Sequence, residues 1–143
     1  MRVTEILDRK GTKTVTVAKT DTVGRAVEVL REHGFGALVV SSDGKKIEGI
    51  ISERDVVRAL GLREDLLDLP VSEIMTEKVF TCTRSDRIDS LMSMMTDKRI
   101  RHLPVEVDGV LSGLVSIGDV VKHRVSELEQ ETQVMQDYIH HGR

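Results

Sequence analysis

Hydrophobic and polar residues follow one another in the same order in the two halves of the chain. In the first half, apolar residues recur at i, i+3, i+4 and i+7 from Val23, and in the second half they do so from Ile88. This spacing places the apolar side chains on one face of a helix. Polar residues at 20–21 and 85–86 precede these segments and are typical of helix N-termini. The pattern therefore predicts one amphipathic helix in each half.

Short β-like segments surround each predicted helix. Residues 14–17 and 79–82 come before the helices, and residues 37–40 and 103–107 come after them. In both halves an Asp-Gly pair then separates two β-like runs, which indicates a tight turn because both positions tolerate positive φ. Each half therefore reads β-α-β-β-α. The chain predicts an α/β (α+β) fold made of two repeats, each about 60 residues long.

A nine-residue stretch occurs twice, at residues 49–57 (GIISERDVV) and 113–121 (GLVSIGDVV). In each copy a Ser-x-x-Asp segment lies where a strand should pass into a helix. The free backbone N–H groups and the dipole at a helix N-terminus favour an anion there. The same spacing is close to a capping box, in which the serine and the acidic residue satisfy the helix N-terminus themselves. Ligand binding and helix capping are both open interpretations of these segments.

The order of the segments predicts three parts of the chain. These are a first repeat over residues 1–66, a second repeat over residues 67–126 and a C-terminal helical tail over residues 127–143. The connection at residues 62–69 is acidic and leucine-rich, and it predicts a short helical turn that Pro70 stops. A three-stranded sheet of this size leaves an apolar face exposed. We therefore expect the two repeats to bury these faces and their helices against each other.

The tail carries a pattern of its own. Six positions recur at alternating spacings of four and three residues, namely Val121, Val125, Leu128, Thr132, Met135 and Ile139. A 3.5-residue period is typical of a helix with one narrow apolar seam. Three arrangements of this helix are open. It folds back on its own domain, it packs on a partner subunit, or it frays.

Composition limits the classes of partner. Aromatic residues make up 2% of the 143 residues and the net charge is −3, whereas proteins that bind nucleic acid usually combine stacking aromatics with a basic surface. We therefore expect no nucleic-acid partner. No apolar run approaches a membrane span and the N-terminal residues lack an apolar signal segment, so we expect no membrane partner and a cytoplasmic setting. Cys82 is the only cysteine and is expected to pack as a small buried residue.

Together these segments resemble the CBS domain, and the two repeats resemble a tandem CBS pair (a Bateman module) in a stand-alone protein. The resemblance rests on the two G-h-h-S-x-x-D-V-V stretches (h is apolar), the R-H-L-P-V segment at residues 101–105, the Asp-Gly turns, and a V-x-E-I-h segment before each first strand. It implies repeats packed with pseudo-two-fold symmetry around two clefts, commonly in a disk-like homodimer. It also implies an adenosine-containing ligand. AMP is the first candidate, and NAD, ADP, ATP and S-adenosylmethionine are the others.

The resemblance also implies roles for individual residues. In each cleft the aspartate of the Ser-x-x-Asp segment holds the ribose, while the serine and nearby basic residues reach the phosphate. The base lies against the other repeat. The second cleft then consists of Ser116, Asp119, Arg101 and His102, facing Val15, Thr16, Phe35 and Gly36. The first cleft consists of Ser52, Arg54 and Asp55, facing Phe80, Thr81, Ile100 and Arg101.

Charge distinguishes the two clefts. Arg101 and His102 add positive charge beside Asp119, whereas the corresponding positions in the first cleft are the uncharged Gly36 and Ala37. Within its own motif the first cleft has only one cation to compensate, in the position before the aspartate. We therefore expect unequal affinities, with the stronger site at Asp119.

These expectations describe a regulatory module rather than an enzyme. The sequence contains no recognisable nucleophile–base pair, metal-ligand cluster or Walker-type loop, and the adjacent His140 and His141 do not converge on one metal ion. We expect a sensor that binds an adenosine nucleotide, forms a homodimer and signals to an unidentified downstream protein. The alternative is a structural interaction module that dimerises and binds no nucleotide.

Overall fold

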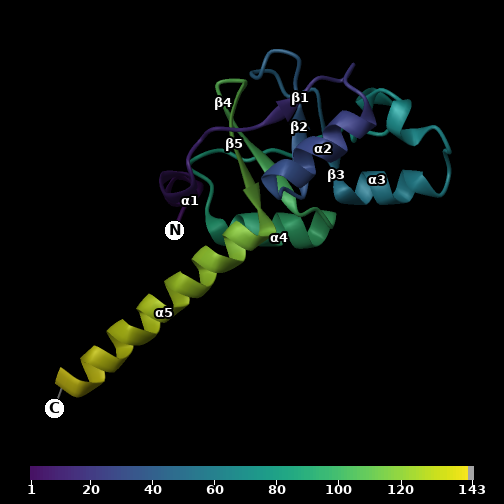
Figure 1. Ribbon diagram of the computed structural model, residues 1–143. Coiled ribbons are helices and arrows are strands. Elements are labelled where there is room, and N and C mark those ends of the chain that lie inside the picture. Colours follow the sequence, from purple (N-terminus) through teal and green to yellow (C-terminus); the bar gives the residue numbers. More distant parts are fainter. Residues whose placement is uncertain (142–143) are drawn as a thin grey trace.

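The computed structural model describes residues 1–141, and Figure 1 shows two α/β repeats from which one long helix projects. The first repeat contains α1 (Val3–Lys10), β1 (Thr16–Val17), α2 (Val23–His33), β2 (Ala37–Val40), β3 (Gly49–Ser52) and α3 (Glu53–Leu60). Two short 3₁₀ helices follow, η1 (Leu66–Asp68) and η2 (Val71–Glu73). The second repeat contains α4 (Ile88–Lys98), β4 (His102–Val107), β5 (Val110–Ser116) and α5 (Ile117–His141). This order confirms the predicted tandem α/β architecture, including the short helical turn before Pro70.

The sheets of the two repeats differ in size. In the first repeat, β1 pairs in parallel with β2, and β2 pairs antiparallel with β3. In the second repeat, within the described residues, only β4 and β5 form a sheet, and the expected strand at residues 79–82 is reduced to one parallel bridge between Cys82 and Val105. A longer ladder would need the N–H of residue 104 to donate to residue 80, but Pro104 has no N–H. The prediction of three strands is therefore wrong for the second repeat.

The two Asp-Gly pairs form different turns. At Asp108 and Gly109 the φ angles are 51° and 78°, so both residues are left-handed and a tight hairpin joins β4 to β5. Between β2 and β3, residues 41–48 form a longer loop. In this loop the Asp43 carboxylate accepts hydrogen bonds from the backbone N–H groups of residues 45–46, at 2.8 and 2.9 Å. The predicted tight turn is thus confirmed in the second repeat only.

The polar residues before α2 and α4 act mainly on the preceding turns. Thr22, rather than the residues at 20–21, is the N-cap of α2, and its hydroxyl accepts a 3.1 Å hydrogen bond from the N–H of Arg25. The carboxylates of Asp21 and Asp86 accept hydrogen bonds from backbone N–H groups three residues earlier, at 2.9 and 2.8 Å. Helix α4 begins without a side-chain cap. Both helices were predicted correctly, but the polar residues at 20–21 and 85–86 do not cap them.

The hydrophobic core consists of two clusters that cross the boundary between the repeats. Val3, Ile6 and Leu7 of α1 are buried in the cluster formed by α4, β4, β5 and the start of α5. In exchange, Val71 of the segment after Pro70 is buried in the cluster of the first repeat, where Ile74 and Met75 also pack. Each repeat therefore contributes its N-terminal segment to the core of the other. This exchange brings the end of α1 close to the start of α5.

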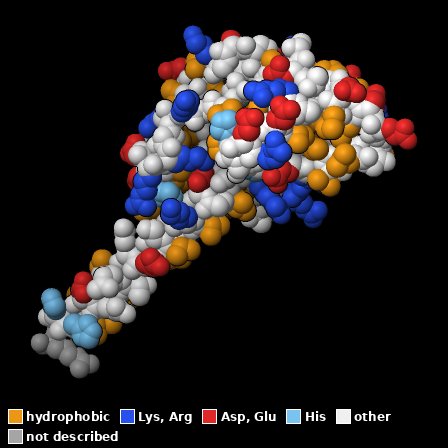
Figure 2. Space-filling model, in the orientation of Figure 1, with side chains coloured by type: hydrophobic (Ala, Val, Ile, Leu, Met, Phe, Trp, Pro, Cys, Tyr) orange, Lys and Arg blue, Asp and Glu red, His pale blue; other side chains and the backbone are white. Residues whose placement is uncertain are grey.

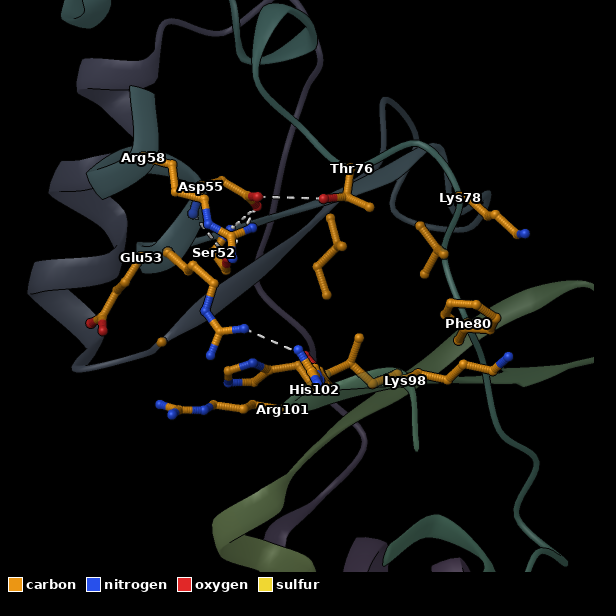
Figure 3. Close-up of a pocket in the computed structure, with 16 residues that line it drawn as sticks. Ser52, Glu53, Asp55, Arg58, Thr76, Lys78, Phe80, Lys98, Arg101 and His102 are labelled. Atoms are coloured by element: carbon orange, nitrogen blue, oxygen red, sulfur yellow. Dashed lines mark hydrogen bonds between the residues drawn. The ribbon is translucent and has the colours of Figure 1, made fainter. Parts of the chain in front are cut away.

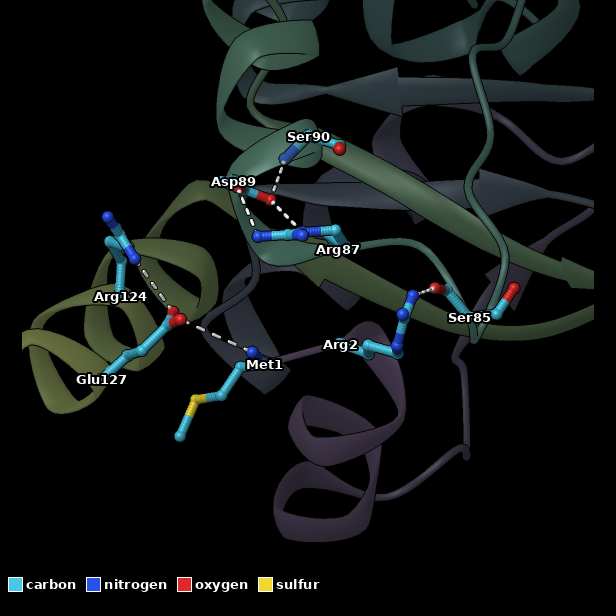
Figure 4. Close-up of polar contacts among 8 residues, drawn as sticks. All are labelled: Met1, Arg2, Ser85, Arg87, Asp89, Ser90, Arg124 and Glu127. Carbon is cyan, nitrogen blue, oxygen red and sulfur yellow. Dashed lines mark hydrogen bonds and ion pairs between the residues drawn. The ribbon is translucent and has the colours of Figure 1, made fainter. Parts of the chain in front are cut away.

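Polar contacts join the N-terminus of the chain to the segment before α4 and to the second and third turns of α5 (Figure 4). The guanidinium of Arg2 donates to the backbone carbonyl of Ser85, just before α4. The carboxylate of Glu127 in α5 lies 3.2 Å from the guanidinium of Arg124 and 3.6 Å from the amine of Met1. These contacts, together with the shared core, fix the direction in which α5 leaves the domain.

Helix α5 is continuous over its 25 residues and projects away from both repeats (Figure 1). Val120 and His123 near its start are buried, whereas every residue from 128 to 141 is exposed. Of the three arrangements considered for the tail, folding back on its own domain is therefore wrong. Among residues 1–141, no helix is both long and apolar enough to cross a membrane.

Candidate functional site

Both Ser-x-x-Asp segments form capping boxes. At the start of α3, the Ser52 hydroxyl accepts from the N–H of Asp55 at 3.3 Å, and the Asp55 carboxylate accepts from the N–H of Ser52 at 2.8 Å. At the start of α5, Ser116 and Asp119 make the same two hydrogen bonds at 3.2 and 2.9 Å. The capping interpretation is therefore correct for both copies. In each box one carboxylate oxygen serves the cap, so ligand binding depends on what surrounds the other oxygen.

A cavity with a volume of about 420 Å³ lies between the repeats at the start of α3 (Figure 3). One wall belongs to the first repeat and the other to the second, so an occupant would touch both. The first repeat contributes Gly36, Ile50, Ser52, Glu53, Arg54, Asp55 and Arg58. The second contributes Thr76, Lys78, Val79, Phe80, Lys98, Arg99, Ile100, Arg101 and His102. Of the residues expected in this cleft, only Thr81 is absent from the lining.

Positive charge dominates this cavity. Six cationic side chains line it and only two acidic ones, Glu53 and Asp55, do so. The cations come from three places in the chain, namely α3, residues 78–80 and the end of α4 with the residues that follow. The guanidinium of Arg54 also donates a 3.4 Å hydrogen bond to the carbonyl of Arg99, which links the two walls. A cavity with this charge balance favours an anionic ligand.

The carboxylate of Asp55 lies on the edge of this cavity without a cationic partner among residues 1–141. One of its oxygens accepts hydrogen bonds from the N–H and the hydroxyl of Ser52, at 2.8 and 3.0 Å. The other lies 3.4 Å from the hydroxyl of Thr76, a long contact from the second repeat. That second oxygen can accept a further hydrogen bond from a ligand hydroxyl.

Phe80 provides an apolar surface at the opposite side of the cavity (Figure 3). The ammonium groups of Lys78 and Lys98 lie 5.7 and 5.3 Å from the centre of its ring, within the range of cation–π contacts. Ile100 extends the same wall. An aromatic and aliphatic wall beside cations suits a ligand that has both a flat apolar part and a charged part.

The second cavity is smaller, at about 170 Å³. Its lining includes Ser116, His102, Val15, Phe35 and Gly36, as the sequence predicts. Thr16, Asp119 and Arg101, which were also expected here, do not line it, and Arg101 lies along the larger cavity instead. The cations of the second cavity are Lys10 and Lys13, which sequence reasoning missed.

Asp119 is engaged by one of these lysines. The ammonium of Lys10 lies 2.6 Å from its carboxylate. Partial burial raises the pKa of Asp119, but the hydrogen bonds from Lys10 and Ser116 outweigh this effect and hold the pKa below its ordinary value of 3.8. The carboxylate that was expected to hold a ribose in this cleft is therefore ionised and paired within the protein. Lys10 and the N–H of Ser116 share its Oδ2 atom, and among residues 1–141 its other oxygen has no hydrogen-bond partner.

His102 belongs to both cavities. Its ring faces Gly36, where a Cβ atom would lie 3.2 Å from two ring atoms, so only glycine leaves this space free. Burial is the main cause that lowers the pKa of His102 from its ordinary value of 6.5, and the charge of Lys10 adds to it. Near neutral pH the ring is therefore uncharged and forms a shared wall between the two cavities.

Two α/β repeats with a cavity between them, a capping aspartate at its edge and cations around it define a module of two tandem repeats. The profile of the CBS domain family matches residues 3–62 and 71–126, one match for each repeat. The chain belongs to the CBS domain family.

Similar proteins support this assignment. The mitochondrial CBS domain-containing protein CBSX3 of Arabidopsis thaliana is 42% identical over 127 residues, which cover 85% of this chain and 62% of the relative. The chain therefore spans less than two thirds of that plant protein. The name of that relative refers to mitochondria, whereas the cytoplasmic setting of this chain stays a prediction. The CBS domain-containing protein YhcV of Bacillus subtilis is 24% identical over 87% of this chain and 88% of its own length.

Solved structures show the same fold. A CBS-domain containing protein from Agrobacterium tumefaciens has a TM-score of 0.83 and 44% identity, over 87% of this chain and 99% of its own. The CBS domain pair of protein MJ0100, solved in complex with 5′-methylthioadenosine and S-adenosyl-L-methionine, has a TM-score of 0.75 and 24% identity. That match covers 85% of this chain and 98% of the other. At this identity it supports the fold alone.

Proposed function

We propose that this chain is a non-catalytic regulatory module that binds an adenosine nucleotide between its two repeats, with AMP as the first candidate. The observation that carries the proposal is the cavity of about 420 Å³, which is lined by Asp55 and six cationic residues. The volume lies within the range of small-molecule sites, roughly 300 to 1,000 Å³. A nucleotide offers the matching groups, namely ribose hydroxyls, a flat base and an anionic phosphate.

Each group of the ligand has a partner in this proposal. The outer oxygen of Asp55 accepts the ribose hydroxyls, because a carboxylate is an acceptor only. Arg54 and Arg101 contact the phosphate, since a guanidinium donates in a planar fork that fits phosphate oxygens. The Ser52 hydroxyl adds a donor at the start of α3. The base packs on Phe80 and Ile100.

Charge favours nucleotides over S-adenosylmethionine for this chain. The sulfonium and ammonium groups of S-adenosylmethionine are positive and would face a cavity that already holds six cations and two acids. AMP, ADP, ATP and NAD bring phosphate instead. Two structures of one protein of this fold, MJ0100, contain S-adenosyl-L-methionine and methylthioadenosine, which is consistent with a ligand of the adenosine class. For this chain the phosphorylated members of the class fit better.

The proposal takes the cleft of Asp55 as the principal site. The sequence alone predicts the stronger site at Asp119, because Arg101 and His102 are near this residue in the repeat pattern. The larger volume, the position of Arg101 and the pairing of Lys10 with Asp119 all support the first cleft. Unequal affinities remain part of the proposal, with the stronger site now at Asp55.

Regulation would follow from the position of the cavity between the repeats. A ligand that touches both walls stabilises the arrangement in which they face each other, and it shifts the population only by its difference in affinity between arrangements. A downstream protein would read this shift in a homodimer of the module. A similar protein from Burkholderia ambifaria carries a provisional name in signal transduction, which is consistent with this role.

The test is a binding panel on the full chain, by calorimetry and thermal unfolding, with AMP, ADP, ATP, NAD and S-adenosylmethionine. A ligand at one hundred times its Kd should stabilise the protein by about 2.7 kcal/mol. Asp55→Asn, which keeps a capping acceptor, should weaken AMP binding at least tenfold, and Asp119→Asn should change it less than threefold. If no adenosine ligand shifts the unfolding transition, the chain is the interaction module that binds no nucleotide.

A further inference from the structure

Helix α5 carries an exposed apolar seam that nothing in the described chain covers. Its members are Val121, Val125, Leu128, Met135 and Ile139, whose exposed fractions range from 44% to 64%. Figure 2 shows hydrophobic side chains along the projecting helix, between its polar ones. Thr132 completes the series, so the seam follows the spacing of a coiled coil over its whole length.

The seam lies on a different side of α5 from the face that packs on the domain. At about 100° per residue, its members centre roughly 120° around the helix axis from Val120 and His123, which are buried. The domain therefore does not compete for the seam. From residue 128 onward the helix is exposed on all sides, which leaves room for a partner helix along that part.

The residue types in the seam favour a pair of parallel helices. With Val125 as an a position, the a positions are Val125, Thr132 and Ile139, and the d positions are Val121, Leu128 and Met135. Branched residues at a with Leu at d are typical of two-stranded parallel coiled coils. The polar threonine in the middle of the seam penalises a shifted register, because it would then face an apolar residue.

The flanking charges discriminate between the two possible directions. In a parallel pair, Arg124 at a g position faces Glu129 of the second copy at the following e position, and this favourable contact occurs twice by symmetry. In an antiparallel pair that aligns all seam positions, Glu129 would face Glu129 of the second copy, and Glu131 would face Glu131 of the second copy. Like charges at these positions repel. Charge therefore favours the parallel direction.

We infer that residues 121–139 of α5 pair with the same segment of a second copy of this chain as a parallel two-stranded coiled coil. The pairing places both modules at the same end of the coil, with the starts of their α5 helices adjacent. The inference does not depend on the ligand, because the seam contains no residue that lines either cavity.

Single cysteines test both the contact and its direction. In a parallel coil the two d positions of a pair face each other, so Leu128→Cys and Met135→Cys should each form a disulfide-linked dimer under mild oxidation. Gln130→Cys points outward at an f position and should remain at least tenfold less cross-linked. The native Cys82 does not interfere, because it is buried and burial raises the pKa of its thiol to about 12. If Leu128→Cys links to Thr132→Cys in a mixture but not to itself, the helices are antiparallel and the inference is wrong.

The mass in solution provides a second, independent readout. The full chain should sediment as a dimer, and Leu128→Glu with Met135→Glu should sediment as a monomer at the same concentration. Both positions are exposed, so circular dichroism should show the fold unchanged. Gln130→Glu with Gln133→Glu adds the same charge outside the seam and should remain dimeric. A monomeric wild-type chain would overturn the inference, as would a double seam variant that stays dimeric, because another surface would then hold the copies together.

Discussion

Lys10 and Asp119, which are 109 positions apart in the chain, form an ion pair in which ammonium and carboxylate lie 2.6 Å apart. The pair joins the end of α1 to the start of α5. Within residues 1–141, the equivalent carboxylate of the first repeat, Asp55, accepts hydrogen bonds only from the neutral groups of Ser52 and Thr76. Two copies of one motif are therefore in different electrostatic states, because the end of α1 lies over only one of them.

Removal of this ion pair should make the protein slightly less stable in a pH-dependent way. The pKa of Asp119 is held below 3.8, so its contribution is present above that pH and is lost as the pH falls through the folded-state pKa. Lys10→Met should lower the free energy of unfolding by about 0.5 kcal/mol at pH 7, because both side chains are partly exposed. Urea unfolding at pH 7, 5 and 3 measures the free energy of unfolding of both proteins. The difference between Lys10→Met and the wild type should be smallest at pH 3.

Lys13→Met is the matched control, since Lys13 lines the same cavity. It should leave stability unchanged within error at all three pH values. An equal loss of stability in both lysine variants would mean that general positive charge, and not the pair with Asp119, is responsible.

His102 should reduce stability in mildly acidic solution. Burial and the nearby Lys10 lower its pKa in the folded protein from 6.5, whereas the unfolded chain keeps the ordinary value. As the pH falls below about 6.5, the unfolded chain binds a proton that the folded chain does not, so the free energy of unfolding decreases. The loss is about 1.4 kcal/mol for each unit of difference in pKa. His102→Gln should remove this part of the pH dependence in thermal unfolding between pH 7.5 and 5.

His140→Gln is the corresponding control, because His140 is exposed near the end of α5. It should follow the wild-type curve. If His102→Gln also follows that curve, the ring is solvated enough to bind a proton in the folded state and the assignment of a neutral shared wall is wrong.

Local features of the fold could be predicted from the sequence because they depend on neighbouring residues. The helical stripes from Val23 and Ile88 and the two capping boxes are set by spacings of three and four residues. The absence of a third strand in the second repeat was also encoded locally, in Pro104. Pro104 lies in the R-H-L-P-V segment, and its missing N–H is sufficient to interrupt the ladder there.

The charges of the two cavities could not be predicted in this way. Lys10 reaches the second cavity because α1 packs in the core of the second repeat, and Lys78 and Lys98 both lie beside Phe80 in the first cavity. Each of these placements depends on contacts between segments far apart in the chain. The sequence-based prediction counted only the charged residues near each Ser-x-x-Asp segment. It therefore favoured the cleft of Asp119, which is the smaller one in the structure.

The glycines that open the repeated stretch are required by close packing. A Cβ atom on Gly49 would lie 2.7 Å from the sulfur of Met75 and 3.1 Å from the carbonyl oxygen of Thr76. That oxygen also accepts a hydrogen bond from the N–H of Ile50. Gly49→Ala should therefore lower the free energy of unfolding by about 1 to 3 kcal/mol, as overpacked cores do. Urea denaturation measures the change.

Gly61→Ala provides the contrast. Gly61 ends α3 with a right-handed backbone, and no atom lies within 4 Å of the place where its Cβ would be. Alanine should raise the free energy of unfolding there by about 0.4 to 1 kcal/mol, because it restricts the unfolded chain. Similar effects of the two substitutions would contradict the packing explanation for Gly49.

Arg99 should be a residue at which stability and ligand binding oppose each other. It ends α4 with φ 54° and ψ 44°, the left-handed conformation that Gly34 adopts at the end of α2 with φ 65° and ψ 33°. This conformation costs a residue with a Cβ atom about 1 kcal/mol or more. Arg99 is also among the residues that line the cavity of Asp55, where positive charge favours a phosphate. The strain and the charge therefore come from the same side chain.

Arg99→Gly should raise the free energy of unfolding by about 1 kcal/mol and should weaken AMP binding several-fold, since it relieves the backbone and removes a cation. Arg99→Asn separates the two effects, because asparagine also lacks the charge but gains less in the left-handed region than glycine. It should lose a similar amount of affinity with a smaller change in stability. Urea denaturation and calorimetry on the same preparations measure both quantities. A glycine variant that binds AMP like the wild type would place the phosphate away from Arg99, and one that is less stable would show that the arginine side chain stabilises the end of α4.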